Sequence, residues 1–330
     1  MSRRISMNII EVKNLTKKFN GITAVDRISF EVKKGEIFGF LGPNGAGKST
    51  TINMLSTILS PTEGEAFINN FNILSQKDEV RKSIGLVFQD PSLDDRLTAE
   101  ENLRFHTRLY GVPKDEYRKR EKEVLQLVDL WERRNEVIKN FSGGMKRRLE
   151  IARGLIHYPA VLFLDEPTIG LDPQTRAHLW SYILKLKREK EMTIFMTTHY
   201  MNEAENCDRI AIIDNGKIIA LDTTDNLKTQ VGGDVIRMKT NNKPSLKKEL
   251  EERYKVEVKE EDGTLRIEVA NGDQFLPRLF NELTAKIDAI ELRKPTLDDV
   301  FLNFTGHAIR EEEASDKEHM RQQMHMRRRT

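Results

Sequence analysis

A glycine-rich loop lies between a short apolar segment and a segment with helical spacing. Residues 36–41 predict a buried strand, residues 42–50 form the loop, and residues 51–59 place apolar side chains on one side of a helix. The loop, Gly-Pro-Asn-Gly-Ala-Gly-Lys-Ser-Thr, has the spacing of a phosphate-binding loop. Its glycines let backbone N–H groups turn inward at the positive end of a helix, where they can bind the phosphates of a nucleoside triphosphate. The complete spacing between the right elements favours a P-loop α/β fold over a chance glycine turn.

The loop residues have separate predicted roles. Lys48 is expected to reach the β- and γ-phosphates, because its ammonium group can pair with their oxygens. The Ser49 hydroxyl is expected to bind Mg²⁺. The remaining candidates for contacts with the nucleotide are Gly42, Asn44, Gly45, Ala46, Gly47 and Thr50.

Four polar side chains follow other predicted strands of the chain. Asp165 and Glu166 end an apolar strand, and Gln89 and His199 each follow another one. Ligands of parallel α/β sheets bind at this edge of the sheet. Two buried carboxylates are unfavourable unless they meet a cation or transfer a proton, so Asp165 is assigned to Mg²⁺ and Glu166 to activation of the attacking water. Gln89 is placed to reach the metal or the water, and His199 to sense the γ-phosphate.

An antiparallel β unit is predicted beside the nucleotide. Residues 9–13 and 28–32 alternate between apolar and polar side chains, as half-exposed strands do. Phe19 lies between these strands, where an aromatic ring can stack on adenine. Taken alone, Phe19 is better explained as a core residue, so this assignment depends on the family resemblance described below.

The segment of about residues 90–158 is predicted to be a helical insertion in the α/β pattern. Thr98 opens a capping box, and Ser142 caps a later helix of the same segment. Gly143 and Gly144 expose the first N–H groups of that later helix, which form an anion site. A helix start of this kind is common, so it is evidence for a nucleotide site only together with the apolar strand that follows and ends in Asp165 and Glu166.

Composition excludes few classes of protein. A chain of 330 residues suggests about two domains, and a net charge of +2 gives no overall signal for nucleic-acid binding. The single cysteine, Cys207, excludes an intramolecular disulfide and fits a reducing cytosol. No apolar run approaches the roughly 18 to 20 residues needed to span a bilayer.

Taken together, these motifs resemble the nucleotide-binding subunit of ATP-binding cassette (ABC) transporters. The resemblance covers residues 1–222 and rests on six motifs in the order of the family: residues 42–50, Gln89, Ser142-Gly143-Gly144, Asp165-Glu166, Asp172 and His199. It implies a head-to-tail homodimer in which each ATP lies between one phosphate loop and the Ser142-Gly143-Gly144 segment of the other copy. The sequence departs from the usual pattern in three places. The signature has Phe141 for Leu and Met145 for Gln, the adenine-stacking position has Phe19 for Tyr, and the turn at residues 169–172 is Ile-Gly-Leu-Asp where Ser-Ala-Leu-Asp is commoner.

The resemblance also implies roles for single residues. Glu166 would be the general base of ATP hydrolysis, Phe19 would stack on adenine, and Asp172 would communicate across the dimer. Mg²⁺ would be bound by Ser49, Gln89 and Asp165. The helical insertion would meet the membrane subunit.

The remaining third of the chain is predicted to form a separate α+β domain. Residues 223–306 have the order β-α-β-β-α-β, which predicts a small ferredoxin-like accessory domain. Residues 295–306 resemble the closing helix of daunorubicin-type and multidrug-type exporter ATPases, which implies regulation or subunit pairing. Because no catalytic cluster is evident there, a packing and dimer-stabilising role is preferred. Residues 307–330 lack an apolar period and are predicted to be disordered.

The predicted function is ATP hydrolysis that powers export of a small, drug-like or amphipathic compound through a separate polytopic membrane permease. The subunit would be cytoplasmic and bound to the membrane through that permease, with no nucleic-acid partner. Lipid, polysaccharide or ion transport are alternatives, because the missing permease chooses the cargo. A soluble cassette acting on ribosomes or DNA is disfavoured, because such chains generally carry two cassettes or long coiled-coil insertions. A P-loop kinase would require neither Ser142-Gly143-Gly144 nor His199.

Overall fold

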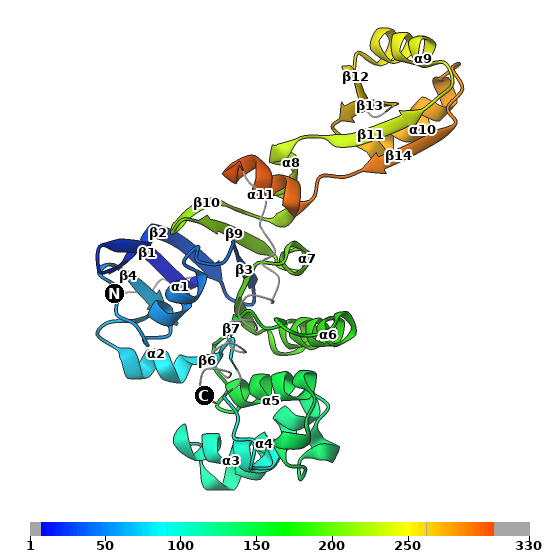
Figure 1. Ribbon diagram of the computed structural model, residues 1–330. Helices are drawn as coiled ribbons and strands as arrows, with labels where there is room; N and C mark the ends of the chain where they lie inside the picture. Colours follow the sequence, from blue (N-terminus) through cyan, green and yellow to red (C-terminus); the bar gives the residue numbers. More distant parts are fainter. Residues whose placement is uncertain (1–7, 91, 262, 307–330) are drawn as a thin grey trace, which may run out of the picture.

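The computed structural model describes residues 8–90, 92–261 and 263–306, and the molecule is elongated (Figure 1). The sheets that carry the phosphate loop lie in the middle. A helical part lies at one end and a small α+β domain lies at the other (Figure 1). The predicted disordered tail, 307–330, lies outside the described residues.

The central sheet has six strands in the order β10-β9-β3-β8-β7-β6. Their bounds are β3 Ile37–Leu41, β6 Ile84–Val87, β7 Val161–Asp165, β8 Thr193–Thr198, β9 Arg209–Asp214 and β10 Lys217–Asp222. Strands β6, β7, β8, β3 and β9 pair in parallel, and β10 pairs antiparallel with β9. Every residue of β3, β7 and β8 is buried, which explains their continuous apolar sequences, because both faces of this sheet are covered.

A second sheet, in the order β2-β1-β4-β5, packs on one face of the central sheet and is the predicted antiparallel β side. Its strands are β1 Asn8–Phe19, β2 Ile22–Lys33, β4 Glu63–Ile68 and β5 Phe71–Asn72. Helix α1, Lys48–Leu55, adds Ile52 and Leu55 to the same core, and α2 spans Lys77–Ser83. Phe30 of β2 stacks on Phe38 of β3 with ring centroids 5.4 Å apart, so aromatic packing joins the two sheets.

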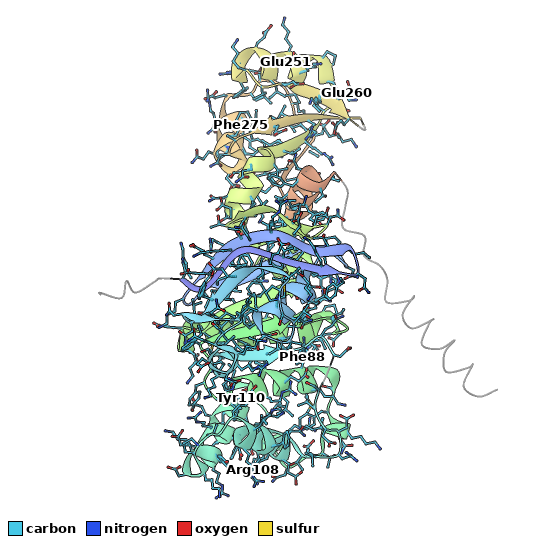
Figure 2. The ribbon with its side chains drawn as sticks, turned by 90° about the vertical axis from the view of Figure 1, so that its left-hand side faces the viewer. Phe88, Arg108, Tyr110, Glu251, Glu260 and Phe275 are labelled. Carbon is cyan, nitrogen blue, oxygen red and sulfur yellow. The ribbon has the colours of Figure 1, made fainter. Side chains whose placement is uncertain are left out.

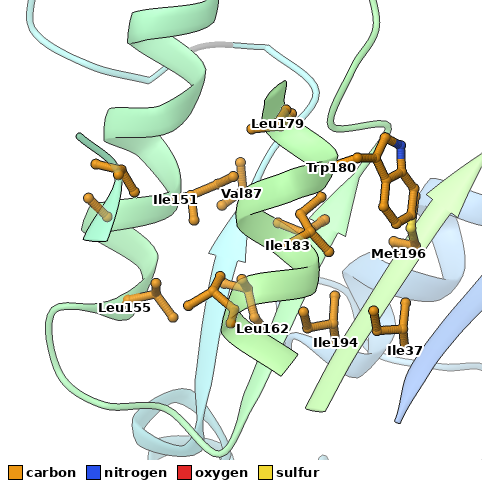
Figure 3. Close-up of a cluster of buried hydrophobic side chains, with 14 of the residues drawn as sticks. Ile37, Val87, Ile151, Leu155, Leu162, Leu179, Trp180, Ile183, Ile194 and Met196 are labelled. Carbon is orange, nitrogen blue, oxygen red and sulfur yellow. The ribbon is translucent and has the colours of Figure 1, made fainter. Parts of the chain in front are cut away.

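Helices cover the opposite face of the central sheet. Figure 3 shows Ile151 and Leu155 of α5 and Ile183 of α6 packed around Leu162 of β7. The helices of this part are α3 Ala99–Leu109, α4 Tyr117–Leu127, α5 Gly143–Leu155, α6 Pro173–Lys190 and α7 Met201–Ala204. Short 3-10 turns occur at η1 Lys114–Glu116, η2 Trp131–Arg133 and η3 Ile138–Asn140. The predicted capping box of Thr98 is present at the start of α3.

The small domain has its own core and the predicted order of elements. It contains β11 Asp234–Lys239, α9 Lys243–Glu249, η4 Leu250–Tyr254, β12 Val258–Glu261, β13 Thr264–Val269, α10 Gly272–Glu282 and β14 Ala289–Arg293. The sheet order β12-β13-β11-β14 is fully antiparallel, as expected for a ferredoxin-like unit. Helices α8, Thr224–Val231, and α11, Leu297–Thr305, flank this unit in sequence, and their buried side chains join the core of the cassette instead.

Within the described ranges, no helix is both long enough and apolar enough to cross a membrane.

Candidate functional site

The phosphate loop joins β3 to α1 in a conformation that depends on glycine. Gly47 is the N-cap of α1 with φ of 106°, and a Cβ there would lie 2.6 Å from the carbonyl oxygen of Ala24. A Cβ on Gly42 would lie 2.2 Å from the carbonyl oxygen of Ile213. The loop therefore approaches its neighbours so closely that side chains are excluded, and the N-terminus of α1 faces the site.

Lys48 lies beneath this loop and links it to the end of β7. Its Nζ donates to the carbonyl oxygens of Gly42 (2.8 Å) and Pro43 (3.0 Å). The same Nζ lies 3.2 Å from Oε1 of Glu166. Burial lowers the pKa of Lys48, and the Glu166 carboxylate opposes that shift. The ammonium group of Lys48 is thus fixed where the phosphate loop meets the end of β7.

Asp165 and Ser49 come together at the end of β7. The Ser49 hydroxyl donates to Oδ1 of Asp165 at 3.3 Å, and the Thr197 hydroxyl donates to the same oxygen at 2.5 Å. Burial raises the pKa of Asp165, while these hydroxyl groups lower it. A carboxylate and a hydroxyl are the hard oxygen ligands that Mg²⁺ takes together with substrate phosphates, so this pair fits the metal.

Gln89 follows β6, the strand next to β7, and thus lies at the same edge of the sheet. Its side chain is half-buried and takes no part in the hydrogen bonds that join Ser49, Asp165 and Thr197. Gln89 therefore remains a candidate for the metal or the water by its position alone.

The Glu166 carboxylate is the point where two of the predicted catalytic side chains meet. Oε1 of Glu166 lies 3.3 Å from Nδ1 of His199 as well as 3.2 Å from Nζ of Lys48. Burial acts to raise the pKa of Glu166, but His199 and Lys48 outweigh it, so the net pKa lies below its usual value. The backbone of Glu166 has φ of 45°, and its N–H donates to the Thr197 hydroxyl at 3.0 Å. This carboxylate is held ionised, as a general base must be.

Ser142, Gly143 and Gly144 form the start of α5, next to the start of α6. Ser142 caps α5 by accepting from the N–H of Met145 at 3.3 Å. A Cβ on Gly144 would lie 2.3 Å from Cγ2 of Thr175, so glycine permits the two helices to approach. Asp172 caps α6 and accepts from the N–H (3.0 Å) and hydroxyl (2.6 Å) of Thr175.

The surface beside Ser142 and Gly144 is separate from the phosphate loop of the same chain. A cavity of about 300 Å³ there is lined by α5, α6 and Asp129, and no residue of the phosphate loop lines it. An anion bound at the start of α5 would therefore not be in contact with the phosphate loop of the same chain.

Phe19 ends β1 and is 43% exposed, so it is not a core residue. Nζ of Lys17 lies 5.0 Å from the centroid of its ring. The exposed ring is available to stack on a planar group.

Arg147 is a central residue of the site that the sequence analysis missed. Its guanidinium donates to four carbonyl oxygens around the site: Phe88 (2.5 Å), Pro167 (2.7 Å), Asp165 (3.1 Å) and Glu166 (3.2 Å). It also pairs with the buried Glu150 carboxylate at 3.1 Å. Burial lowers the pKa of Arg147, and Glu150 opposes that shift. The only signal in the sequence was the position of Arg147 on the buried side of α5, among apolar residues.

Two family models match the chain. A model described as ABC transporter matches residues 25–169. A model described as ATP-binding protein DrrA1-3-like, C-terminal domain, matches residues 223–305.

Curated relatives match along nearly the whole chain. The linearmycin resistance ATP-binding protein of Bacillus subtilis (strain 168) is 40% identical over 312 residues, which cover 92% of this chain and 100% of that protein. The daunorubicin/doxorubicin resistance ATP-binding protein of Streptomyces peucetius is 38% identical over 321 residues, covering 94% of this chain and 97% of that protein.

Solved cassettes share the fold. The cbiO1 protein of Clostridium perfringens, part of the ABC transporter complex cbiONQ, has a TM-score of 0.62 and 31% identity, covering 66% of this chain and 89% of its own. A dimeric ATP-binding cassette in a post-hydrolysis state bound to ADP and Pi has a TM-score of 0.59 and 32% identity, covering 65% of this chain and 98% of its own. These matches confirm the predicted α/β ABC cassette, and the chain belongs to the family of ABC transporter ATP-binding proteins.

Proposed function

We propose that this chain hydrolyses ATP with Glu166 as the general base and drives export of a small amphipathic compound through a separate membrane permease. The observation that carries the proposal is the meeting of Lys48 and His199 at the carboxylate of Glu166. A phosphate-binding ammonium, an ionised base and an imidazole are thereby grouped at the edge of the sheet where ligands of α/β folds bind.

In this proposal, the chain positions the reactants more than it reacts with them. The phosphate loop and Lys48 bind the β- and γ-phosphates, and Ser49, Gln89 and Asp165 would hold Mg²⁺. Bound Mg²⁺ would neutralise phosphate charge. Glu166 takes a proton from a water that attacks the γ-phosphorus, ADP leaves, and His199 orients the γ-phosphate.

A head-to-tail pair of chains would complete each site. The separation of Ser142 and Gly144 from the phosphate loop of the same chain supports this arrangement. A phosphate bound at the N-terminus of their helix would belong to an ATP held by the phosphate loop of another copy. In the pair, Ser142, Gly143 and Gly144 would contact the γ-phosphate of the partner. Phe19 would stack on adenine, and Asp172 would carry information between the two sites.

The helical end of the molecule is proposed as the permease contact. Apolar side chains are exposed there, including Phe105 (60%), Leu109 (67%), Tyr110 (38%) and Phe88 (37%). Figure 2 shows Tyr110 in this part of the molecule and Phe88 where it meets the central sheets, both far from the small domain. Contiguous exposed apolar patches occur at protein contacts, so exposed apolar side chains in one part of the molecule support a permease contact there. Such a contact would hold the subunit at the cytoplasmic face of the membrane.

The cargo is inferred from the relatives. Two of them are named for resistance to linearmycin and to daunorubicin or doxorubicin, which favours export of a drug-like molecule over transport of a lipid, polysaccharide or ion. Because the permease selects the cargo, this part of the proposal depends on the family alone.

The test is a pull-down from solubilised membranes with the Glu166→Gln protein and MgATP. We expect a polytopic membrane protein to be recovered, and we expect Lys48→Ala in the same protein to abolish that recovery. Leu109→Glu should weaken recovery, whereas Leu302→Glu, the same change at another exposed leucine, should not. Recovery of ribosomes or nucleic acid without a membrane protein would overturn the transport assignment and leave the hydrolysis assignment standing.

A further inference from the structure

Two side chains, Tyr200 and Arg176, lie one behind the other next to His199. The ring of Tyr200 lies against the imidazole of His199, with centroids 4.0 Å apart and planes inclined by 42°. The guanidinium carbon of Arg176 lies 4.4 Å from the centroid of the Tyr200 ring. The cation lies over one aromatic ring and a second, tilted ring lies beside that one, so each group restricts the movement of the next.

Arg176 joins this stack to the turn that contains Asp172. Arg176 lies in the first turn of α6, and its backbone N–H donates to the backbone carbonyl oxygen of Asp172 at 2.9 Å. A displacement of the turn would therefore move the guanidinium and, through Tyr200, the imidazole.

The buried Glu203 carboxylate ties the same two segments together. It accepts a hydrogen bond from the Thr198 hydroxyl at 2.8 Å and one from the Thr168 hydroxyl, and Nε of Arg176 lies 3.8 Å from it. The Thr198 hydroxyl in turn accepts from the N–H of Tyr200 at 2.9 Å. These hydrogen bonds fix the backbone on both sides of His199, but none of them is made by the imidazole itself.

The orientation of that imidazole is not set by a hydrogen bond among the described residues. Nδ1 of His199 is buried and 3.3 Å from Glu166, yet it has no partner with hydrogen-bond geometry in this part of the chain. Besides its approach to Glu166, the imidazole lies against the ring of Tyr200, and this contact restricts the rotation of the imidazole.

We infer that Tyr200 and Arg176 are positioning residues that hold the imidazole of His199 against Glu166 and link its orientation to the Asp172 turn. This inference rests on the catalytic roles proposed above for His199 and Glu166. In this inference Tyr200 and Arg176 act on the phosphoryl transfer through the imidazole, because the contacts lead from Arg176 to the Tyr200 ring and from that ring to His199.

The experiment measures ATP hydrolysis of the full chain under steady-state and single-turnover conditions. Tyr200→Leu removes the ring, Tyr200→Phe keeps it, and Arg176→Met removes the cation while keeping much of the side chain. We expect Tyr200→Leu and Arg176→Met each to lower kcat by about three- to tenfold with little change in KM for ATP, because stacking contacts of this kind contribute modest free energies. Tyr200→Phe should keep kcat at the level of the unchanged protein, because the aromatic ring that contacts His199 and Arg176 is still present.

A double-mutant cycle with His199→Ala separates positioning from a structural role. If Tyr200 acts through the imidazole, Tyr200→Leu should produce no further loss in single-turnover rate once His199 is alanine. A further loss of the same size would overturn the inference, as would an unchanged kcat for both Tyr200→Leu and Arg176→Met. Should Tyr200→Leu fail to fold, Arg176→Met takes its place in the cycle.

The two proposals fail differently. An unchanged rate for His199→Ala alone would remove His199 from catalysis and this inference with it. A large loss for His199→Ala that adds to the loss for Tyr200→Leu would leave the proposed function intact and reject only the positioning role.

Discussion

The nucleotide edge of the central sheet and the open face of the small domain both carry many charged side chains, but the two regions differ in how far these side chains are buried and paired. At the nucleotide edge, Lys48 and Glu166 are 4% and 7% exposed, and the ammonium and the carboxylate lie 3.2 Å apart. On the small domain, Lys259, Arg266 and Arg237 lie opposite one another on adjacent strands. That cationic row tolerates like charges, because water screens them and Glu261 and Glu268 lie 3.6 and 3.9 Å from Arg266.

The difference shows where the position of a charged group is fixed by its surroundings. A buried charge must have partners on several sides, and each partner constrains its position. An exposed charge contributes little to stability and is free to move. Equivalent substitutions in the two regions should therefore have very different effects, and three matched pairs test this comparison.

The largest expected effect is on catalysis, from the pair Glu166→Gln and Glu261→Gln. Glu166→Gln removes the base but keeps the shape of the side chain, so kcat should fall by about 10²- to 10⁴-fold while ATP still binds. Glu261, on the edge strand β12, is 44% exposed, and its change to Gln should leave kcat unaltered. The measurements are steady-state phosphate release and equilibrium binding of labelled ATP. Unchanged turnover for Glu166→Gln would remove Glu166 from the base role.

The second pair, Arg147→Met and Lys259→Met, tests stability. Arg147→Met removes the nearer of the two arginines that face the buried Glu150 carboxylate, leaving Arg153 at 3.9 Å, and it takes one donor away from each of four carbonyl groups. We therefore expect a loss of about 3–5 kcal/mol in the free energy of unfolding. The Lys259 side chain is 56% exposed, and its loss should change the free energy of unfolding by less than about 0.5 kcal/mol.

Urea unfolding followed by circular dichroism covers both regions of the chain. Tryptophan fluorescence reports on the cassette alone, because the two tryptophans, Trp131 and Trp180, both lie there. The comparison would be broken by equal losses for the two variants, or by a loss for Arg147→Met that the fluorescence does not register.

The same contrast explains which parts of the site the sequence could predict. The positions of Lys48 and Ser49 follow from the local spacing of the phosphate loop. Asp165 lies 116 residues from Ser49, but it ends an apolar strand, and the rule that ligands bind at one edge of a parallel sheet was enough to group it with them. Arg147 bonds to the carbonyl of Phe88, which lies 59 residues away in the chain, and no local pattern shows that contact. Buried polar groups whose partners come from distant segments are recognisable only once the fold is known.

The fold shows a similar limit. The phosphate loop and apolar strands predicted the α/β cassette, and strand order predicted the ferredoxin-like unit. The resemblance of residues 295–306 to the closing helix of exporter ATPases predicted a helix here, but not which core would bury it. In the structure, Leu297, Val300 and Phe301 pack with the cassette, because the chain returns from β14 to the side of α8. A hydrophobic period gives the face of a helix and not its partner.

The third pair, Thr197→Val and Thr264→Val, has the smallest expected effect and tests single hydroxyl groups. Thr197 is fully buried, donates to Asp165 and accepts from the N–H of Glu166, so valine leaves that N–H without its acceptor. We expect a loss of about 1–3 kcal/mol in the free energy of unfolding, measured by tryptophan fluorescence in urea. The hydroxyl of Thr264 donates only locally, to the carbonyl of Glu261 at 2.9 Å, in a half-exposed strand.

Thr264→Val should therefore leave the stability of the chain, measured by circular dichroism, almost unchanged. The two substitutions remove the same atom from the same kind of β-branched side chain, so strand propensity cancels in the comparison. The difference between them then measures how much the buried network around Asp165 and Glu166 depends on one hydroxyl group. Equal losses at the two sites would show that the hydroxyl of Thr197 has no more influence than one near the surface, and would contradict the view that charged groups at the nucleotide edge are fixed by their surroundings.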